Sequence, residues 1–150
     1  KFSEWIKFYN HGTLILNVKE EGLEEKIINY ITLYKIKSYF FLDQSFPFLL
    51  KTAFQGEMNC AVRISEYESV ETALKLKGII SWVWIDMFED FSFTLNDINK
   101  LKLADFKLCL VSPELQSKNI NNIKILKDKF KKNGIYFDAV CTKKPENWEK

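Results

Sequence analysis

Histidine and arginine are almost missing from this chain, which contains one of each, His11 and Arg63. Lysine and arginine together number 22, so every other strong base is a lysine. This usage indicates that lysine fills every position where a positive charge is enough. We therefore expect Arg63 at a position that requires the planar guanidinium group. His11 precedes the first apolar run, so we expect it at the amino end of the fold, away from a site at the opposite end.

Cysteine is scarce, and its spacing is not that of a metal site or a disulfide framework. Cys60, Cys109 and Cys141 lie far apart in apolar segments, without a CxxC pair. Such a set is typical of reduced core residues. We therefore expect a cytoplasmic protein.

Long apolar runs and an excess of one charge are lacking too. No apolar run approaches the roughly 20 residues that a membrane-spanning helix needs. The net charge is +2, from 22 basic and 20 acidic residues, which leaves no basic excess for nucleic acid. We therefore expect no transmembrane segment and no nucleic-acid partner. P-loop, GxGxxG, GxSxG and zinc-ligand motifs are also absent, so any chemistry has to come from other charged residues.

The chain does contain enough apolar residues for one core. Its 150 residues have the size of a single domain, and 47% are hydrophobic and 15% aromatic. Six short runs rich in β-branched and aromatic residues recur along it. They are residues 14–19, 39–43, 61–66, 82–88, 107–114 and 137–142. Near-continuous apolar runs of this length are typical of parallel strands covered on both faces.

Amphipathic stretches separate these runs and predict helices. We expect helices over 22–34, 66–77, 95–103 with Thr94 as the cap, and 118–132, which ends at Asn133 and Gly134. A short helix is expected after Pro47, and another at the opening segment with Phe2 and Trp5. Strand followed by helix, six times, is the pattern of βαβ units.

We expect residues 1–150 to form one α/β domain, a parallel (β/α) barrel of the TIM type with about six βα units. Charged side chains at the carboxyl ends of most of the strands favour this fold, because a barrel collects such residues into a ring. A doubly wound sheet would concentrate them at one switch point. A receiver-like or flavodoxin-like sheet is a third possibility, but it predicts acids after the first strand, where Lys19 stands.

Arg63 lies inside a strand, on the face shared by Ala61 and Ser65. A buried guanidinium needs a planar acceptor, either a carboxylate such as Asp43 or Asp86, or a bound phosphate or carboxylate. Arg63 could therefore form a structural ion pair between strands or bind a ligand, and the sequence does not decide between these two roles.

The other candidates lie at the same ends of the strands. We expect Lys19, Arg63 and Glu66 to carry the chemistry, although Glu66 and Glu68 flank Tyr67 and one of the two should face the pocket. Substrate contacts are expected from four further residues, which are Asp43, Trp84, Asp86 and Glu114. Asp43 could equally be a helix cap, and Lys19 a lysine at a strand tip.

The segments "LNVKEEGL", "YFFLDQSFP", "VRISEYES", "WVWIDMFED", "CLVSPEL" and "DAVCTKKPENW" together resemble one family. They are similar to bacterial proteins of the glycerophosphodiester phosphodiesterase and phosphatidylinositol-specific phospholipase C superfamily, in particular a branch found beside surface-polysaccharide genes. The resemblance implies an eight-unit (β/α) barrel, a hydrolase of lipid metabolism, and a divalent metal, Ca or Mg. It also implies two histidines, an arginine and acidic metal ligands, most of them on the first strands.

The chain departs from that pattern at several places. No histidine stands where the family has its catalytic pair, and Asn17 replaces the metal-binding glutamate of an "E-x-K" strand end, while Lys19 is kept. The closing "TDxP" reads Thr142-Lys143-Lys144-Pro145 and loses an acid.

Two explanations are open. In the first, the chain is the C-terminal part of a longer phosphodiesterase, carries the substrate side of the site, and has its metal ligands mostly outside it. In the second, it is a reduced relative that binds a phosphate or a phosphorylated sugar without cleaving it, as an accessory to surface-polysaccharide assembly. The expected ligand is thus a small phosphodiester or a phosphorylated sugar.

Overall fold

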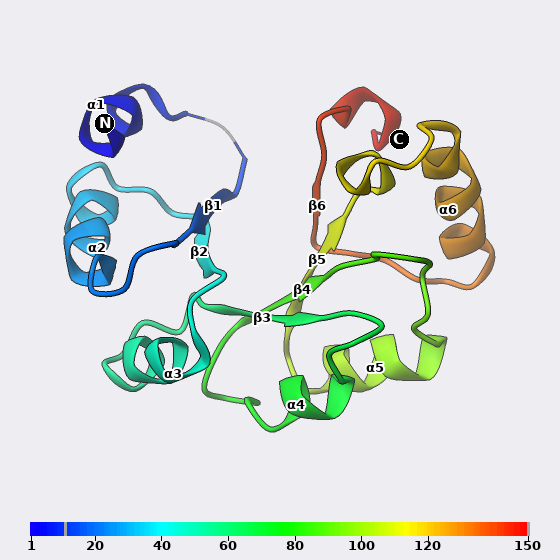
Figure 1. Cartoon of the computed structure of the whole chain (residues 1–150), viewed down its shortest axis with the longest axis horizontal. Coiled ribbons are helices and arrows are strands. Elements are labelled where there is room, and N and C mark those ends of the chain that lie inside the picture. Colours follow the sequence, from blue (N-terminus) through cyan, green and yellow to red (C-terminus); the bar gives the residue numbers. More distant parts are fainter. Residues whose placement is uncertain (11, 150) are drawn as a thin grey trace.

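A computed structural model describes residues 1–10 and 12–149 of the chain. His11 lies outside the described residues, so its expected position at the amino end is not tested. Strands and helices alternate along the chain (Figure 1). The strands are β1 (Leu14–Asn17), β2 (Tyr39–Leu42), β3 (Ala61–Ile64), β4 (Trp82–Ile85), β5 (Lys107–Val111) and β6 (Ala139–Cys141).

Every strand except the last is followed by an α-helix. The α-helices are α1 (Phe2–Trp5), α2 (Glu24–Leu33), α3 (Phe46–Phe54), α4 (Val70–Leu74), α5 (Leu95–Leu103) and α6 (Asn121–Lys132). Short 3-10 helices are η1 (Ile6–Phe8), η2 (Pro113–Gln116) and η3 (Pro145–Asn147). All six predicted strands are confirmed. Lys19, Asp43, Glu66, Asp86 and Glu114, which we expected at the tips of the first five strands, lie in the segments that follow those strands.

All strand pairs are parallel, and their order follows the sequence. One sheet contains β1 and β2, and the other has the order β3-β4-β5-β6. A single parallel bridge between Phe41 and Cys60 joins the two sheets, where the Phe41 amide donates to the Asn59 carbonyl oxygen at 2.7 Å. The prediction of a parallel α/β fold is confirmed at this level. The described residues form no closed barrel.

The two faces of the sheets differ. Side chains such as Leu16, Val62, Val83 and Leu108 point to one face and belong to the main core, together with apolar residues of α2 to α6. Figure 1 shows these helices arranged around the outside of the strands, which form an arc with β1 and β6 at its two ends. The alternate side chains form a second apolar cluster on the inner face. It consists of Phe40, Leu42, Ala61, Trp82, Trp84, Cys109 and Val111.

Local hydrogen bonds explain where two helices begin. Thr94 caps α5 as expected, since its hydroxyl accepts from the Asp97 amide while the Asp97 carboxylate accepts from the Thr94 amide. The helix expected from residue 66 instead begins at Val70, with Ser69 as its cap. Ser65 and Glu68 exchange backbone hydrogen bonds of 3.1 and 3.3 Å, and this turn occupies the first predicted helical residues.

Candidate functional site

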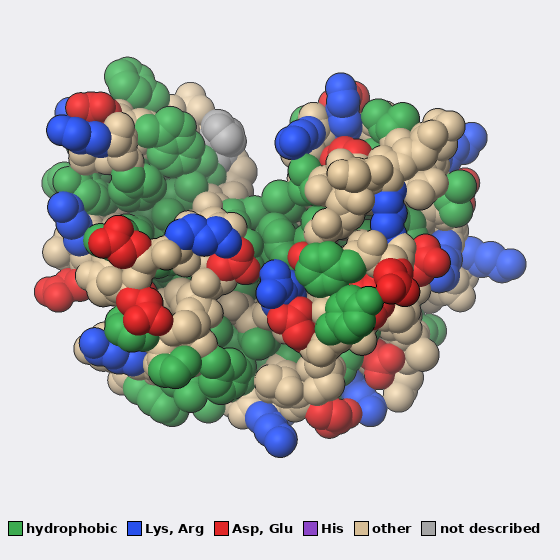
Figure 2. All heavy atoms as spheres, viewed as in Figure 1, with side chains coloured by type: hydrophobic (Ala, Val, Ile, Leu, Met, Phe, Trp, Pro, Cys, Tyr) green, Lys and Arg blue, Asp and Glu red, His purple; other side chains and the backbone are tan. Residues whose placement is uncertain are grey.

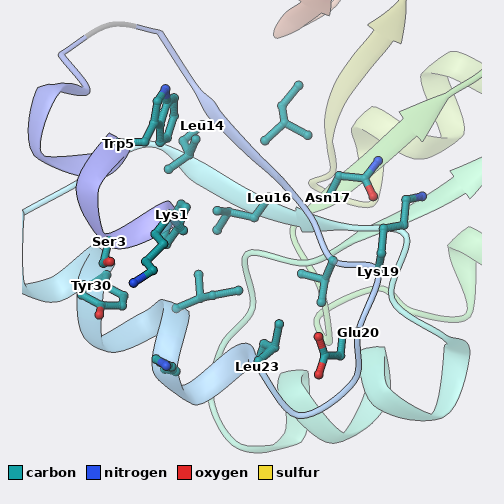
Figure 3. A pocket seen from close by; sticks show the side chains of 15 residues that line it. Lys1, Ser3, Trp5, Leu14, Leu16, Asn17, Lys19, Glu20, Leu23 and Tyr30 are labelled. Atoms are coloured by element: carbon teal, nitrogen blue, oxygen red, sulfur yellow. The ribbon is translucent and has the colours of Figure 1, made fainter.

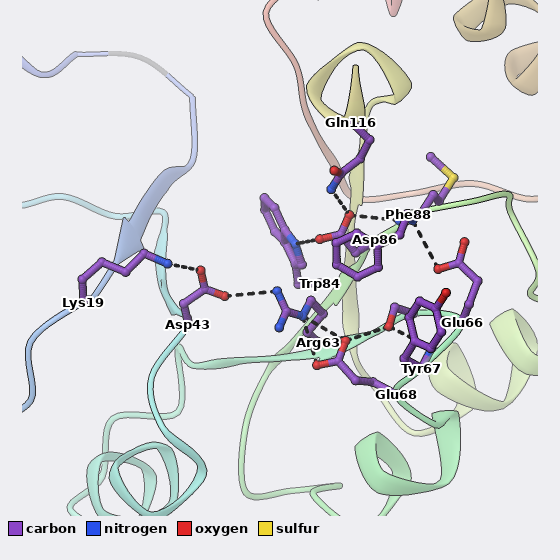
Figure 4. Close-up of polar contacts among 12 residues, drawn as sticks. Lys19, Asp43, Arg63, Glu66, Tyr67, Glu68, Trp84, Asp86, Phe88 and Gln116 are labelled. Carbon is purple, nitrogen blue, oxygen red and sulfur yellow. Dashed lines mark hydrogen bonds and ion pairs between the residues drawn. The ribbon is translucent and has the colours of Figure 1, made fainter. Parts of the chain in front are cut away.

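Three of the predicted site residues meet at the carboxyl ends of β1, β2 and β3. The ammonium of Lys19 lies 2.6 Å from one carboxylate oxygen of Asp43, and Nη1 of Arg63 lies 3.8 Å from the other (Figure 4). Asp43 is therefore shared by two cations from different strands. We refer to Lys19, Asp43, Arg63 and Glu68 as the charged cluster.

The backbone directs Asp43 toward this meeting point. Its φ is 60°, in the left-handed region that Asp tolerates better than most residues, directly after β2. The amide group of Asn17 donates to the same carboxylate at 3.1 Å. Ser45 stands at the N-cap of α3, so the alternative of Asp43 as a helix cap is not what the structure shows.

Arg63 contacts Glu68 more closely than Asp43. Its Nε donates to both carboxylate oxygens of Glu68, at 3.0 and 2.9 Å. Burial lowers the pKa of Arg63, but the hydrogen bond and charge of Glu68 and the charge of Asp43 outweigh it and raise the pKa overall. Within residues 1–10 and 12–149, the two terminal nitrogens make no hydrogen bond, so their N–H groups are available to a ligand.

A hollow of about 790 Å³ opens beside these residues. Its lining includes Lys19, Asp43, Gln44, Arg63, Tyr67 and Glu68. Figure 2 shows positive and negative side chains next to one another around the centre of the visible face, beside hydrophobic side chains. The hollow is thus polar, with charges of both signs at its rim.

Glu66, which we expected to act with Lys19 and Arg63, lies elsewhere. Its carboxylate accepts hydrogen bonds from the backbone amides of Phe88, Glu89 and Asp90, at 3.2, 2.9 and 2.9 Å. Burial raises the pKa of Glu66, but these hydrogen bonds outweigh it and lower the pKa overall. Glu66 holds the loop after β4, and Glu68 is the glutamate that faces Arg63.

Trp84 lies on the inner face of β4, Asp86 directly follows that strand, and both are buried. The Asp86 carboxylate accepts from the indole of Trp84 at 3.4 Å, from its neighbour Met87 at 2.9 Å and from Gln116 at 2.6 Å. Three protein donors occupy this carboxylate. The expected substrate contacts from Asp86 and Trp84 stay predictions, and neither residue lines the hollow beside Arg63.

Glu114 links the ends of β5 and β6. It accepts hydrogen bonds from the hydroxyls of Ser112 and Thr142 and from the Lys143 amide at 3.0 Å. Burial raises the pKa of Glu114, but these donors outweigh it and lower the pKa overall. The structure therefore places Glu114 at the same edge of the sheet as the charged cluster, but not in contact with it.

A second hollow, of about 730 Å³, lies beside β1, between α1 and α2 (Figure 3). Apolar side chains such as Trp5, Leu14, Leu16 and Tyr30 line most of it. Lys19 stands at one end and lines both hollows. Among the predicted site residues, only Lys19 contributes to it, so the hollow beside Arg63 is the candidate site.

The cysteines lie in the strands or next to them, as expected, and Cys60 and Cys109 are buried. Burial raises the pKa of both thiols to about 12, so they are protonated at neutral pH.

Among the described residues, no helix is long and apolar enough to cross a bilayer.

Comparisons with known proteins give no relative. No protein-family model, curated protein or solved structure matches the chain. The resemblance to the phosphodiesterase superfamily therefore stays a prediction.

Proposed function

We propose that the chain forms six consecutive units of a (β/α) barrel of the TIM type. In support, strand order follows sequence order, every pair is parallel, and the helices cover one face while an apolar cluster fills the other. A doubly wound sheet would carry helices on both faces. Since such a barrel needs eight units, β1 and β6 would be its open edges. In this proposal, residues 1–150 supply six of the units of such a barrel.

The function that the site supports best is binding of a small phosphate-bearing molecule, a phosphodiester or a phosphorylated sugar. One observation carries this conclusion. Lys19 and Arg63 converge on Asp43 at the rim of a hollow, and the N–H groups of the two terminal nitrogens of Arg63 make no hydrogen bond within the described residues. A guanidinium offers a flat, two-pronged donor that matches two phosphate oxygens. Asp43 and Glu68 hold the cations in place and offset their charge, so we expect weak rather than tight binding.

The resemblance supports a second candidate, hydrolysis of a phosphodiester by a longer form of the protein. Lys19 and Arg63 would then stabilise the negative charge that develops on the phosphate oxygens. The described residues contain no group of three or more His, Cys, Asp or Glu arranged to hold a metal ion. They do not by themselves fit the Ca or Mg site that the resemblance implies.

Isothermal titration calorimetry with glycerol 3-phosphate and glycerophosphocholine tests the binding function. Arg63→Lys keeps the positive charge but removes the planar, two-pronged donor group, and we expect it to weaken binding roughly tenfold or more. Lys19→Gln should weaken binding by a smaller factor, because its side chain is 71% exposed. Lys100→Gln removes a lysine that pairs with Glu71 at 3.6 Å, and it should bind as the unchanged protein does.

Unchanged binding in both Arg63→Lys and Lys19→Gln would show that the charged cluster is not the phosphate site. Release of glycerol 3-phosphate from glycerophosphocholine, assayed with Ca or Mg on a longer form of the protein, separates the two candidates. Turnover by that form supports the hydrolase, and binding without turnover by that form supports the binding protein.

A further inference from the structure

Two exposed aromatic side chains stand beside the charged cluster. Tyr67, in the loop after β3, is 71% exposed, and Phe88, in the loop after β4, is 41% exposed. Their ring centroids lie 6.3 Å apart with a 40° angle between the planes. The guanidinium carbon of Arg63 lies 5.8 Å from the centroid of the Phe88 ring. The aromatic surface therefore begins directly beside the cation that would hold a phosphate.

Hydrogen bonds hold the two loops that carry the rings. Glu66 accepts from the Phe88 amide and its two successors, which ties the loop after β4 to the loop after β3. The amide of Tyr67 donates to the Ser65 hydroxyl at 3.2 Å, and its phenol donates to Glu89 at 2.8 Å. Exposed rings that are already held in place form a ready contact surface, because little entropy is lost when a ligand covers them.

The surrounding side chains select the kind of ligand. Glu89 contacts the Tyr67 phenol, and Asp43 and Glu68 pair with Arg63, whose guanidinium lies beside the Phe88 ring. Carboxylates accept hydrogen bonds from hydroxyl groups. They also repel further negative charge, which disfavours a nucleoside polyphosphate. A sugar ring satisfies both requirements, since its C–H face is apolar and its edge carries hydroxyls.

We propose that Tyr67 and Phe88 form the ring-binding part of the site, and that the ligand is a cyclic sugar monophosphate rather than an acyclic glycerophosphate. The phosphate contacts Arg63 and Lys19, and the sugar ring covers the Phe88 and Tyr67 side chains. This inference rests on the proposed phosphate site, and it identifies the rest of the ligand as a sugar ring.

Calorimetric titrations with the 1-phosphates of glucose, galactose and mannose, and with glycerol 3-phosphate, test the proposal. At least one hexose phosphate should bind about tenfold more tightly than glycerol 3-phosphate. Tyr67→Ala should remove this preference, so that this variant binds the hexose phosphates and glycerol 3-phosphate with affinities within about twofold of one another. Tyr67→Phe, which keeps the ring and loses the bond to Glu89, should retain the preference. Tyr136→Ala is the matched control, because Tyr136 is 67% exposed and lies before β6.

Each outcome decides between the proposals. Equal binding of all four compounds by the unchanged protein, or a preference that survives in Tyr67→Ala, overturns the role of the rings while the phosphate site stands. Loss of both kinds of ligand in Tyr67→Ala, with the fold intact by circular dichroism, also contradicts a ring-specific role. If none of the four compounds binds, the phosphate site itself is wrong and the ring site falls with it.

Discussion

The carboxylate of Glu66 joins two loops of the candidate site. It accepts three backbone amide hydrogens of residues 88–90, which would otherwise be bonded only to water. Hydrogen bonds to an ionised acceptor favour the charged form, and they hold the pKa of Glu66 below its ordinary value of 4.5 despite the opposing effect of burial. The ionised carboxylate therefore stabilises the folded protein.

We expect Glu66→Gln to lower the free energy of unfolding by about 1 kcal/mol at neutral pH, a low figure because the carboxylate is partly exposed. Since the folded-state pKa is depressed, this contribution is fully present above the ordinary pKa and is lost as the pH falls through the folded-state value. The difference between the two proteins should thus shrink below about pH 4.5. Urea unfolding at several pH values measures it. Glu20→Gln, at an exposed position, should show no such difference, and a gap that persists at low pH would contradict the mechanism.

Arg63 shows how far sequence reasoning reaches at single side chains. Its place inside a strand predicted a planar acceptor, either a carboxylate such as Asp43 or Asp86 or a bound ligand, and the structure shows ion pairs with Asp43 and with Glu68. The choice between Glu66 and Glu68 was not predictable, because strand alternation stops at Ser65. There a turn reverses the chain and brings Glu68 back beside Arg63. Tyr67 and Phe88 were also missed as a pair, since their approach depends on how two separate loops are held.

Among the helices, α5 has the most complete N-terminal capping. The Thr94 hydroxyl accepts from the Asp97 amide at 3.1 Å, and the Asp97 carboxylate accepts from the Thr94 amide at 3.0 Å. The hydroxyl of Thr94 also lowers the pKa of Asp97. Two amide hydrogens at the start of the helix are thereby satisfied.

Removal of this cap has a measurable cost. Thr94→Ala should lower the free energy of unfolding by about 1 kcal/mol, because the Asp97 amide loses its acceptor. Thr94→Ser keeps the hydroxyl and should be nearly as stable as the unchanged protein. Chemical denaturation of the three proteins gives the comparison. Equal stability of the Ala and Ser variants would mean that the hydroxyl does not contribute.

Local signals of this kind explain which elements were predictable. The cap at Thr94 and the apolar runs are short-range features, so α5 and all six strands were placed correctly. For α4, the pattern from residue 66 onward was misleading, because Ser65 and Glu68 form a turn that the apolar spacing does not reveal. Closure of a barrel depends on pairing between distant strands, and no local pattern reports it.

Among the neighbouring strands that the structure describes, β2 and β3 share the least backbone pairing. Each of the other neighbouring strand pairs shares a continuous register, whereas these two share one bridge at Phe41 and Cys60. On the inner face, Phe40 crosses this junction. Its ring stacks on that of Trp82 with centroids 4.6 Å apart, and it is fully buried. We therefore expect the packing of Phe40 to couple the unfolding of the two sheets.

Phe40→Ala tests this coupling. The cavity should lower the free energy of unfolding by about 3–5 kcal/mol. Because it weakens the packing between β2 and β3, residues 1–54 should unfold before the rest. Hydrogen exchange resolved by segment, together with calorimetry, distinguishes two transitions from one. Leu108→Ala is the control, because Leu108 is equally buried but lies within the four-stranded sheet. It should lower stability by a similar amount and keep one transition. If Phe40→Ala also unfolds in a single step, the two sheets are coupled through the helices on the outer face rather than through the inner cluster.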